Sequence, residues 1–392
     1  ALYDDRGDNT LVAGPRTRID TRSSEAPEPA GNPLIPPTGV ALPTPRDWGG
    51  ARSLFSPQAR WDVEIGPVIG GGPSWTRYGF RRVPFATQTR LALVYAPLHG
   101  RVGLEGTARF RRTGGGGETR WTGRATQVEM TRFHGLGNDT PPESASESDS
   151  FRVWANVYAL SADLIEEVAR NVRFTVGSTV AYREPEPYEG SPASEPGVIG
   201  GRAFGVGGIH GELSLGGRSP ASFPRRGIHF QANLAGYPLV WGDATEAFAR
   251  GGVTARAYLP LPGPLEPTLA VRAGGERVLG LAPFQHAAYL GGASTLRGHR
   301  RQRFAGEAAV HGGAELRTTL GLVNLHVIGG ELGALALIDA GRVYRAGERS
   351  DRWHTARGGG LWFGTGDRAV IAHLVYAHGE DHMLHAGIGV PF

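Results

Sequence analysis

The chain of 392 residues contains no cysteine. This absence excludes a disulfide scaffold, a cysteine-based zinc site and a thiol nucleophile. Lysine is absent as well, so all 41 basic residues are arginines, spread along the chain with a formal net charge of only +4. Such a mild and dispersed charge does not favour a nucleic-acid partner. No run of about 18 or more apolar residues is present, which excludes a transmembrane helix.

Glycine and proline are abundant, with 61 and 28 residues. Each glycine in a helix interior costs about 1 kcal/mol relative to alanine, so a mainly helical fold is excluded. Many prolines gather in residues 1–57, where apolar periodicity is weak. Because proline fixes φ and removes a backbone donor, this composition predicts an extended leader or linker. We expect either that a signal peptide has been removed before Ala1, or that the linker joins a missing domain.

After the linker, apolar and polar side chains alternate along the chain. Within residues 303–320, Ala314 and Leu316 share one parity, whereas Glu315 and Arg317 share the other. Successive side chains of a strand point to opposite faces, so this pattern predicts a strand with one apolar and one charged face. Sixteen segments are predicted as strands: 58–70, 74–84, 87–97, 100–111, 119–132, 149–161, 171–184, 200–217, 225–238, 247–259, 266–278, 303–320, 330–343, 355–365, 368–377 and 382–392.

The connections between these strands differ in length. Those predicted at one end of the sheet are long, namely 133–148, 185–199, 279–302 and 343–354, and those at the other end, 162–170 among them, are mostly shorter. Long loops and short turns are typical of outer-membrane barrels. The last strand ends in the aromatic Phe392, as such barrels commonly do. The sequence therefore predicts an all-β fold, a 16-stranded antiparallel transmembrane β-barrel of the outer membrane over residues 58–392. A soluble β-sandwich is the alternative.

Short motifs follow one another in order through the second half of the barrel. Leu296-Arg297-Gly298 lies in the long loop and is followed by Gly306, by Glu315-Leu316-Arg317 and by Asp339-Ala340-Gly341. Upstream, residues 132–140 have the sequence Arg-Phe-His-Gly-Leu-Gly-Asn-Asp-Thr. These segments resemble motifs of the BamA/TamA-type bacterial surface-antigen barrel superfamily, which includes outer-membrane assembly proteins and two-partner secretion transporters. The chain resembles a member or fragment of that superfamily that lacks the amino-terminal periplasmic repeats.

The resemblance implies that the sixth external loop folds into the lumen and that Arg297 pairs with Asp339 as a latch. Physical chemistry favours the pair, because a buried cation without a partner is costly and an arginine–carboxylate contact holds both groups in one geometry. The alternative is that Arg297 faces solvent in a mobile loop while Asp339 only lines the wall. The superfamily's aromatic residue after Arg-Gly is His299 here, so we expect looser or pH-dependent packing of this loop.

The closing pair of the predicted barrel joins strands 58–70 and 382–392. Glycine weakens a strand and proline removes a ladder donor, so both partners are predicted to pair poorly. The residues assigned to this seam are Trp61, Gly70, Gly387, Gly389 and Phe392. We expect the seam to open sideways into the membrane, where a nascent strand adds to the exposed edge. The alternative is that these glycines reflect only the abundance of glycine in the chain.

Sequence motifs for catalysis are absent. The chain has no Gly-x-Ser-x-Gly elbow, no His-Glu-x-x-His and no P-loop. We therefore expect no catalytic residue, no cofactor and no enzyme activity. His373, His378, His382 and His385 lie close together in the sequence, but positions in a hairpin and in the lumen explain them better than a metal site does. No metal site is predicted.

The predicted barrel leads to two hypotheses about function. In the first, an outer-membrane barrel assists the insertion or translocation of polypeptides, or of lipids, through a weak lateral seam. Its partners are then outer-membrane lipid and lipopolysaccharide, together with unfolded client polypeptides, and the chain acts as a monomer. In the second, the chain is a passive porin or a membrane anchor for a missing soluble domain. Electrical conductance distinguishes them, because an open lumen conducts steadily.

Overall fold

The computed structural model describes residues 48–80, 82–113, 117–142, 149–169, 171–216, 223–325, 328–365 and 370–389. The chain divides into two units, Ala1–Pro45 and Arg46–Phe392, and the first lies outside the described residues. The linker expected over residues 1–57 therefore stays a prediction for residues 1–47. No helix within the described ranges is long and apolar enough to cross a membrane.

The second unit consists almost entirely of β-strands. Its strands are β1 (Gly50–Asp62), β2 (Gly66–Arg77), β3 (Thr87–Ala96), β4 (Arg101–Arg111), β5 (Glu118–Thr126), β6 (Met130–Arg132), β7 (Arg152–Ala169), β8 (Val172–Glu186), β9 (Phe204–Leu215), β10 (Gly227–Gly242), β11 (Phe248–Pro260), β12 (Thr268–Leu279), β13 (Ala288–Leu290), β14 (Phe304–Gly306), β15 (Ala308–Leu325), β16 (Ile328–Tyr344), β17 (His354–Thr365), β18 (Ile371–His378) and β19 (His382–Ile388). Two short 3-10 helices, η1 (Pro192–Ser194) and η2 (Phe284–His286), lie in connections.

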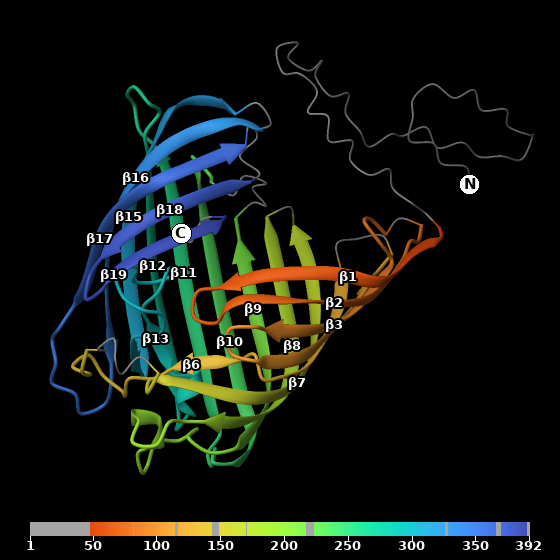
Figure 1. Cartoon of the computed structure of the whole chain (residues 1–392), viewed down its shortest axis with the longest axis vertical. Helices are drawn as coiled ribbons and strands as arrows, with labels where there is room; N and C mark the ends of the chain where they lie inside the picture. Colours follow the sequence, from red (N-terminus) through yellow and green to blue (C-terminus); the bar gives the residue numbers. More distant parts are fainter. Residues whose placement is uncertain are drawn as a thin grey trace, which may run out of the picture. The chain divides into compact units, whose positions relative to one another are not determined.

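The long strands pair in chain order, each antiparallel to the next, from the β1–β2 pair to the β18–β19 pair. The short β6 follows β5 along β7, and β13 and β14 form a separate ribbon. Sixteen long strands, β1–β5, β7–β12 and β15–β19, thus form one curved wall around a lumen (Figure 1). This wall confirms the predicted 16-stranded antiparallel barrel fold.

The prediction of a single first strand over residues 58–70 is wrong. β1 already begins before residue 58 and ends at Asp62, and β2 begins at Gly66. Between them, Oδ1 of Asp62 accepts hydrogen bonds from the backbone N–H groups of Glu64 (2.8 Å) and Ile65 (3.1 Å), and Gly66 has a φ of +82°. Asp commonly forms such side-chain turns, and glycine accepts a positive φ without strain. This turn divides the predicted segment between two strands.

Other predicted boundaries also differ from the structure. The predicted strand 74–84 continues past Arg77, where β2 ends. The segment 303–320 contains both β14 and β15, because the chain leaves the inner ribbon at Gly306 before it joins the wall. The segment 119–132 is interrupted between β5 and β6. The turn expected over 162–170 is instead the last part of β7, where the charged Glu166 and Glu167 continue the pairing with β8.

Side chains of the wall are polar on the inner face and apolar on the outer face, which is the inverse of the arrangement in water-soluble proteins. On β15, Leu316 points outward and is 44% exposed, whereas its neighbours Glu315 and Arg317 point inward and are 1% and 2% exposed. Outward-facing apolar residues on other strands are similarly exposed, among them Leu93 on β3 and Leu104 on β4. A polar interior and an apolar exterior are typical of a barrel surrounded by lipid.

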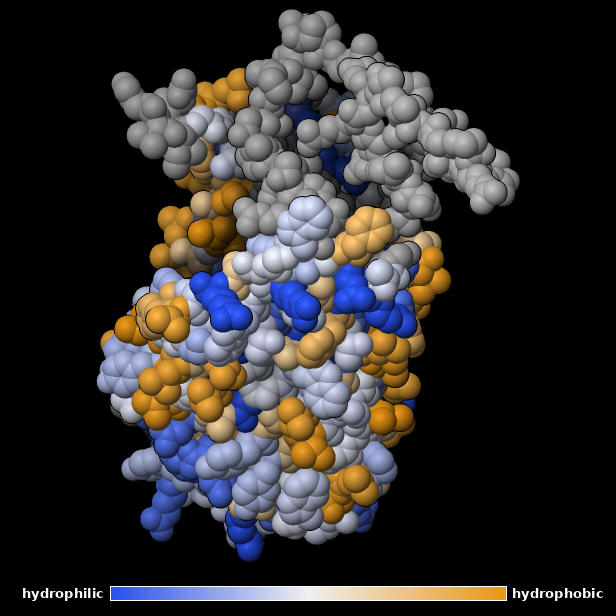
Figure 2. Space-filling model, turned by 90° about the vertical axis from the view of Figure 1, so that its right-hand side faces the viewer, coloured by the Kyte–Doolittle hydropathy of each residue, from blue (hydrophilic) through white to orange (hydrophobic). Residues whose placement is uncertain are grey.

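On the face that Figure 2 shows, apolar side chains are spread over the wall among polar ones. Large exposed apolar residues occur on most of the long strands, including Tyr158 and Leu160 on β7 and Leu374 and Tyr376 on β18. Soluble monomers rarely expose contiguous apolar patches larger than a few hundred Å². The outer surface therefore suits contact with lipid better than contact with water.

The longest connections lie at one end of the wall, as the sequence predicts. At one end, residues 187–203 join β8 to β9 and residues 345–353 join β16 to β17. At the other end, residues 170–171 suffice to join β7 to β8. The connection from β12 to β15, residues 280–307, is the sixth at its end and carries η2, β13 and β14. It is called the sixth loop below.

Candidate functional site

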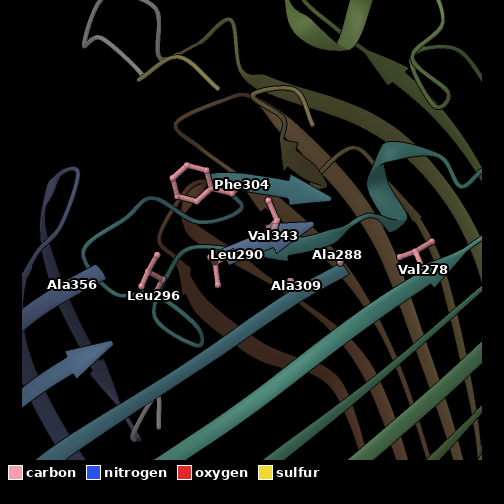
Figure 3. Close-up of a cluster of buried hydrophobic side chains, with 8 residues drawn as sticks. All are labelled: Val278, Ala288, Leu290, Leu296, Phe304, Ala309, Val343 and Ala356. Atoms are coloured by element: carbon pink, nitrogen blue, oxygen red, sulfur yellow. The ribbon is translucent and has the colours of Figure 1, made fainter. Parts of the chain in front are cut away.

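The sixth loop lies along the inner side of the wall. A cluster of buried apolar side chains joins it to β12, β15, β16 and β17 (Figure 3). The cluster consists of Val278, Ala288, Leu290, Leu296, Phe304, Ala309, Val343 and Ala356. Leu296, from the predicted Leu-Arg-Gly motif, is fully buried within it. Since burying one such side chain contributes about 1.5–3 kcal/mol, apolar packing alone holds much of the loop against the wall.

Arg297, directly after Leu296, lies against Asp339 of β16. Its Nε donates to Oδ2 at 2.7 Å, its Nη2 donates to Oδ1 at 2.8 Å, and its backbone N–H donates to Oδ2 at 3.2 Å. The planar guanidinium matches both carboxylate oxygens, which makes the contact strong and directional. The Nη1 of Arg297 donates to Oε1 of Glu315 on β15. Burial opposes the charge, but the two carboxylates outweigh it and raise the pKa of Arg297 above its ordinary value.

Two further arginines complete the group around Arg297. Arg272 of β12 donates from Nη2 to Oδ1 of Asp339 at 3.2 Å, and Arg317 donates from Nε to Oε2 of Glu315 at 2.7 Å. All five side chains are at most 3% exposed. Three guanidinium groups therefore share two carboxylates in a place from which water is largely excluded. These five residues are called the arginine cluster below.

The arginine cluster also holds the backbone of the sixth loop. Arg272 donates to the carbonyl oxygens of Ser294 (2.7 Å) and Thr295 (2.9 Å). Nε2 of His385, on β19, lies 2.8 Å from the carbonyl oxygen of Arg297. The turn of the loop is thus bound by β12, β16 and β19 at once.

Close approach of the loop to the wall explains three glycines of the predicted motifs. A Cβ atom at Gly298 would lie 2.4 Å from the backbone nitrogen of Gly379, and one at Gly306 would lie 2.6 Å from the carbonyl oxygen of Tyr344. A Cβ atom at Gly341 would lie 2.8 Å from the side chain of Leu290 in the loop. These distances are too short for non-bonded atoms, so a larger residue at any of them would push the loop away from the wall.

His299, which follows Arg297-Gly298, is buried inside the barrel. Its ring is 3% exposed, its Nε2 lies 3.2 Å from the carbonyl oxygen of Thr355, and its centroid lies 5.5 Å from that of Phe304. Its Nδ1 lies 3.9 Å from a carboxylate oxygen of Glu380 in the β18–β19 turn. The ring is therefore closely packed, which differs from the looser packing expected for a histidine here.

The upstream motif, residues 132–140, lies against the sixth loop. The backbone N–H of Gly137 donates to the carbonyl oxygen of Ala305 at 2.8 Å. Nη1 of Arg303 donates to Oγ1 of Thr140 at 2.7 Å, and Nη2 of the same residue donates to Oε1 of Glu380 at 2.8 Å. Two segments that lie far apart in the sequence thus meet inside the barrel.

Acidification is expected to weaken the contact between Glu380 and Arg303. Burial would raise the pKa of Glu380, but the nearby ring of His299 and the hydrogen-bonded guanidinium of Arg303 lower the pKa to about 2 from an ordinary value of 4.5. The stability that this carboxylate contributes is therefore present above pH 4.5 and lost as the pH falls toward 2. We expect the thermal unfolding temperature, followed by circular dichroism in micelles, to fall less steeply over this range in Glu380→Gln. Equal slopes for both proteins would contradict this assignment.

The residues assigned to the seam do not all lie on its two strands. Trp61 lies on the edge strand β1, Gly387 lies on the edge strand β19, and Gly389 follows β19. The assignment of Gly70 is wrong, because the turn after β1 places this residue on β2, which pairs with strands on both sides. Phe392 lies outside the described residues.

Neighbouring arginines of the sixth loop contact both hairpins at the seam. Nε of Arg300 donates to Oδ2 of Asp381 in the β18–β19 turn at 3.1 Å, and Nη1 of Arg301 donates to Oδ2 of Asp62 at the end of β1 at 3.3 Å. Among the described residues, no hydrogen-bonded register joins β1 to β19. The sixth loop thus links two edge hairpins whose strands are not joined directly.

Metal ligands do not converge in the described part of the chain, where no group of three or more His, Asp or Glu side chains could hold an ion. In the last hairpin, His385 is buried on the lumen side, whereas His378 and His382 are exposed. The rings of His378 and His382 stack with centroids 4.5 Å apart.

The sequence did not single out Arg272, Arg301 or Asp62, which complete the contacts described above. Arg272 shares the inward parity of its strand, which is a signal for a lumen position but not for a particular partner. The contact of Arg301 with Asp62 joins residues 239 positions apart in the chain. Only the curvature of the wall and the inward path of the sixth loop bring such residues together.

Comparison with solved structures identifies barrels of similar fold. The structure of BamA from Haemophilus ducreyi lacking POTRA domains 1-3 matches with a TM-score of 0.60 and 11% identity, covering 87% of this chain and 69% of that chain. CdiB from Escherichia coli matches with a TM-score of 0.53 and 10% identity, covering 87% of this chain and 61% of that chain. No protein-family model and no curated protein sequence matches. The chain therefore has the BamA-type barrel fold that its motifs predict.

Proposed function

We propose that this barrel lies in the bacterial outer membrane and assists the insertion or translocation of polypeptides through the seam between β1 and β19. One observation carries the proposal: among the described residues, these two edge strands share no hydrogen-bonded register. An edge strand presents unpaired N–H and C=O groups, which readily pair with another extended chain. The exposed apolar wall supports a lipid environment, and the shared fold of BamA and CdiB agrees with the proposal.

Both edge strands carry features that weaken pairing along the seam. β1 contains Pro57, which has no backbone N–H, and its register with β2 shifts between Ser53 and Ser56. β19 is only 7 residues long, and Gly389 just beyond it has a φ of +95°. Proline, bulges and short length are the features by which edge strands resist tight pairing. A seam between such strands opens more easily than the rest of the wall.

The arginine cluster would act as the latch that holds the sixth loop in this mechanism. The contact between Arg297 and Asp339 fixes the loop turn in one place, because both carboxylate oxygens are engaged. Arg300 and Arg301, a few residues further on, then contact the hairpins on the two sides of the seam. Release of the loop would free both hairpins together, so the latch and the seam act as one unit.

Joining β1 to β19 covalently is expected to abolish the insertion of client polypeptides. The chain has no cysteine, so a cysteine pair placed within residues 58–62 and 382–386 alone reacts with a flexible bismaleimide. The linked barrel, reconstituted in lipid vesicles, should no longer accelerate the insertion of an unfolded outer-membrane-type polypeptide. Insertion is measured by protection of the client from added protease.

A matched control links Ile69 of β2 to Tyr95 of β3, which are Cα partners in a hydrogen-bonded part of the wall. This link should leave insertion unchanged. Equal insertion by the seam-linked and unlinked barrels would contradict a lateral seam. Failure of the unlinked barrel to accelerate insertion would contradict the proposed function itself.

A further inference from the structure

A groove of about 780 Å³ lies across β12, β15, β16 and β17. Its lining includes the small residues Gly312 and Ala314 of β15 and Ala340 of β16, together with Val271 and Ile338. The register of the sheet places Val271, Ala314 and Ile338 in one row across three strands. The small residues create the depression, and on one side the next row carries the larger Leu269 and Leu316.

The groove opens on the outer side of the wall. Ile338 is 62% exposed, whereas the next residue, Asp339, belongs to the buried arginine cluster in the lumen. Val271 is likewise exposed beside the buried Arg272. Successive side chains of a strand point to opposite faces, so the groove faces the apolar exterior. Its volume falls within the roughly 300–1,000 Å³ that is usual for small-molecule sites.

Basic side chains stand at one end of the groove. The row that begins at Val271 continues from Ile338 to Arg357 of β17, then to His378 of β18 and His382 of β19. Arg357 and His378 both line the groove, and all three basic side chains are exposed. Among the described residues, no carboxylate forms an ion pair with Arg357, unlike the arginines of the lumen.

The position of these basic residues along the strands agrees with a headgroup contact. His378 ends β18 and His382 begins β19, so both lie at the loop end of the wall. A charged arginine on the outer face of a barrel is costly at the midplane of a membrane and costs little near its surface. A phosphate there would supply the acceptor oxygens that a guanidinium binds best.

We propose that this groove binds one anionic membrane lipid, with its phosphate on Arg357 and His378 and an acyl chain along Ala314 and Val271. The inference rests on the membrane location that forms part of the proposed function. Charge and shape both point to this occupant, because a basic end is continuous with an apolar depression on a lipid-facing wall. Bound lipid would span β12 to β18 and so brace the wall beside the seam strand β19.

Native mass spectrometry of the folded barrel tests this site. The barrel is released from micelles that contain equal amounts of phosphatidylglycerol and phosphatidylcholine, and we expect one phosphatidylglycerol to remain bound. Arg357→Gln should reduce this retention about tenfold, since a charge-assisted contact is lost. The control Arg277→Gln removes another exposed arginine, near the loop end of β12 and outside the groove lining, and should retain the lipid.

A second variant tests the apolar half of the site without changing any charge. Ala314→Phe fills the depression and should also reduce retention of phosphatidylglycerol. Equal retention by Arg357→Gln and Arg277→Gln, full retention by Ala314→Phe, or complete displacement of the lipid by millimolar inorganic phosphate would each overturn the proposal. Folding is verified by heat-dependent migration on gels. Because no client polypeptide is present, the result is independent of whether the barrel inserts proteins.

Discussion

Replacing Asp339 by asparagine is expected to lower the free energy of unfolding of the barrel by about 3–5 kcal/mol. Asp339 accepts hydrogen bonds from Arg297 and Arg272, and Glu315 is the only other carboxylate in the arginine cluster. The variant leaves three buried guanidinium groups with one carboxylate. An unpaired buried charge costs far more than an ordinary surface substitution, so this single change should have the largest effect on stability.

Urea unfolding in micelles, followed by the fluorescence of the 8 tryptophans, measures this effect. Asp351→Asn is the matched control, because the side chain of Asp351 is fully exposed. That variant should change stability by no more than about 0.5 kcal/mol. Adding Arg272→Gln to Asp339→Asn removes one unpaired cation and should restore part of the loss. Equal stability of Asp339→Asn and Asp351→Asn would show that the arginine cluster does not stabilise the fold.

Replacing Arg297 by alanine is expected to release the sixth loop at a smaller cost in stability. Without Arg297, Asp339 keeps its contact with Arg272 and Glu315 keeps its contact with Arg317, so the buried charges remain matched. The loop, however, loses its anchor to β16. Local opening should become easier by at least about 1.4 kcal/mol, which corresponds to about a tenfold increase in the open fraction.

Trypsin measures this release, because the chain contains no lysine and only arginines are cut. Cleavage after Arg300 and Arg303 should be about tenfold faster in Arg297→Ala, in line with the larger open fraction. Arg297→Lys should behave in the same way, since an ammonium group lacks the two-pronged fit to a carboxylate. Arg225→Ala is the control, because Arg225 pairs with Glu266 on the exposed surface and such pairs contribute about 0–1 kcal/mol.

The same variant separates the two functional hypotheses. A barrel plugged by the sixth loop should give low conductance in planar bilayers, and Arg297→Ala should raise the frequency of open currents while insertion of clients is lost. Steady, large currents from the unmodified barrel would favour the passive porin. Unchanged trypsin cleavage together with unchanged insertion in Arg297→Ala would contradict the latch.

The sequence predicts the wall well, because period-two alternation is a local property of each strand. Leu316 beside Glu315 and Arg317 shows this clearly. The first side chain is exposed and its two neighbours are buried, as expected for a strand with two different faces. The motifs also pointed to Arg297 and Asp339, and the structure places these side chains in direct contact. The sequence thus indicates which charged residues face the lumen, but for most of them it does not indicate which residues they contact.

Predictions failed where a side chain or a distant segment decides the local conformation. The turn after β1 depends on the carboxylate of Asp62, which accepts two backbone hydrogen bonds, and alternation alone does not reveal it. Arg132, at the end of β6, and Glu64, in the turn between β1 and β2, form another buried pair, with Nε 2.8 Å from Oε2. Such contacts depend on side chains and on the curvature of the wall, which alternation does not reveal.

A lipid-embedded barrel with an aqueous interior is tested most directly by measuring, in a bilayer, which side chains of one strand face lipid and which face water. Single cysteines placed along β8, from Phe174 to Val180, are labelled with an environment-sensitive fluorophore in reconstituted vesicles. Labels at Phe174, Val176 and Val180 should be quenched by lipid-borne nitroxide, and labels at Thr175 and Thr179 should be quenched by aqueous iodide. Uniform quenching by iodide at all five positions would contradict a transmembrane wall.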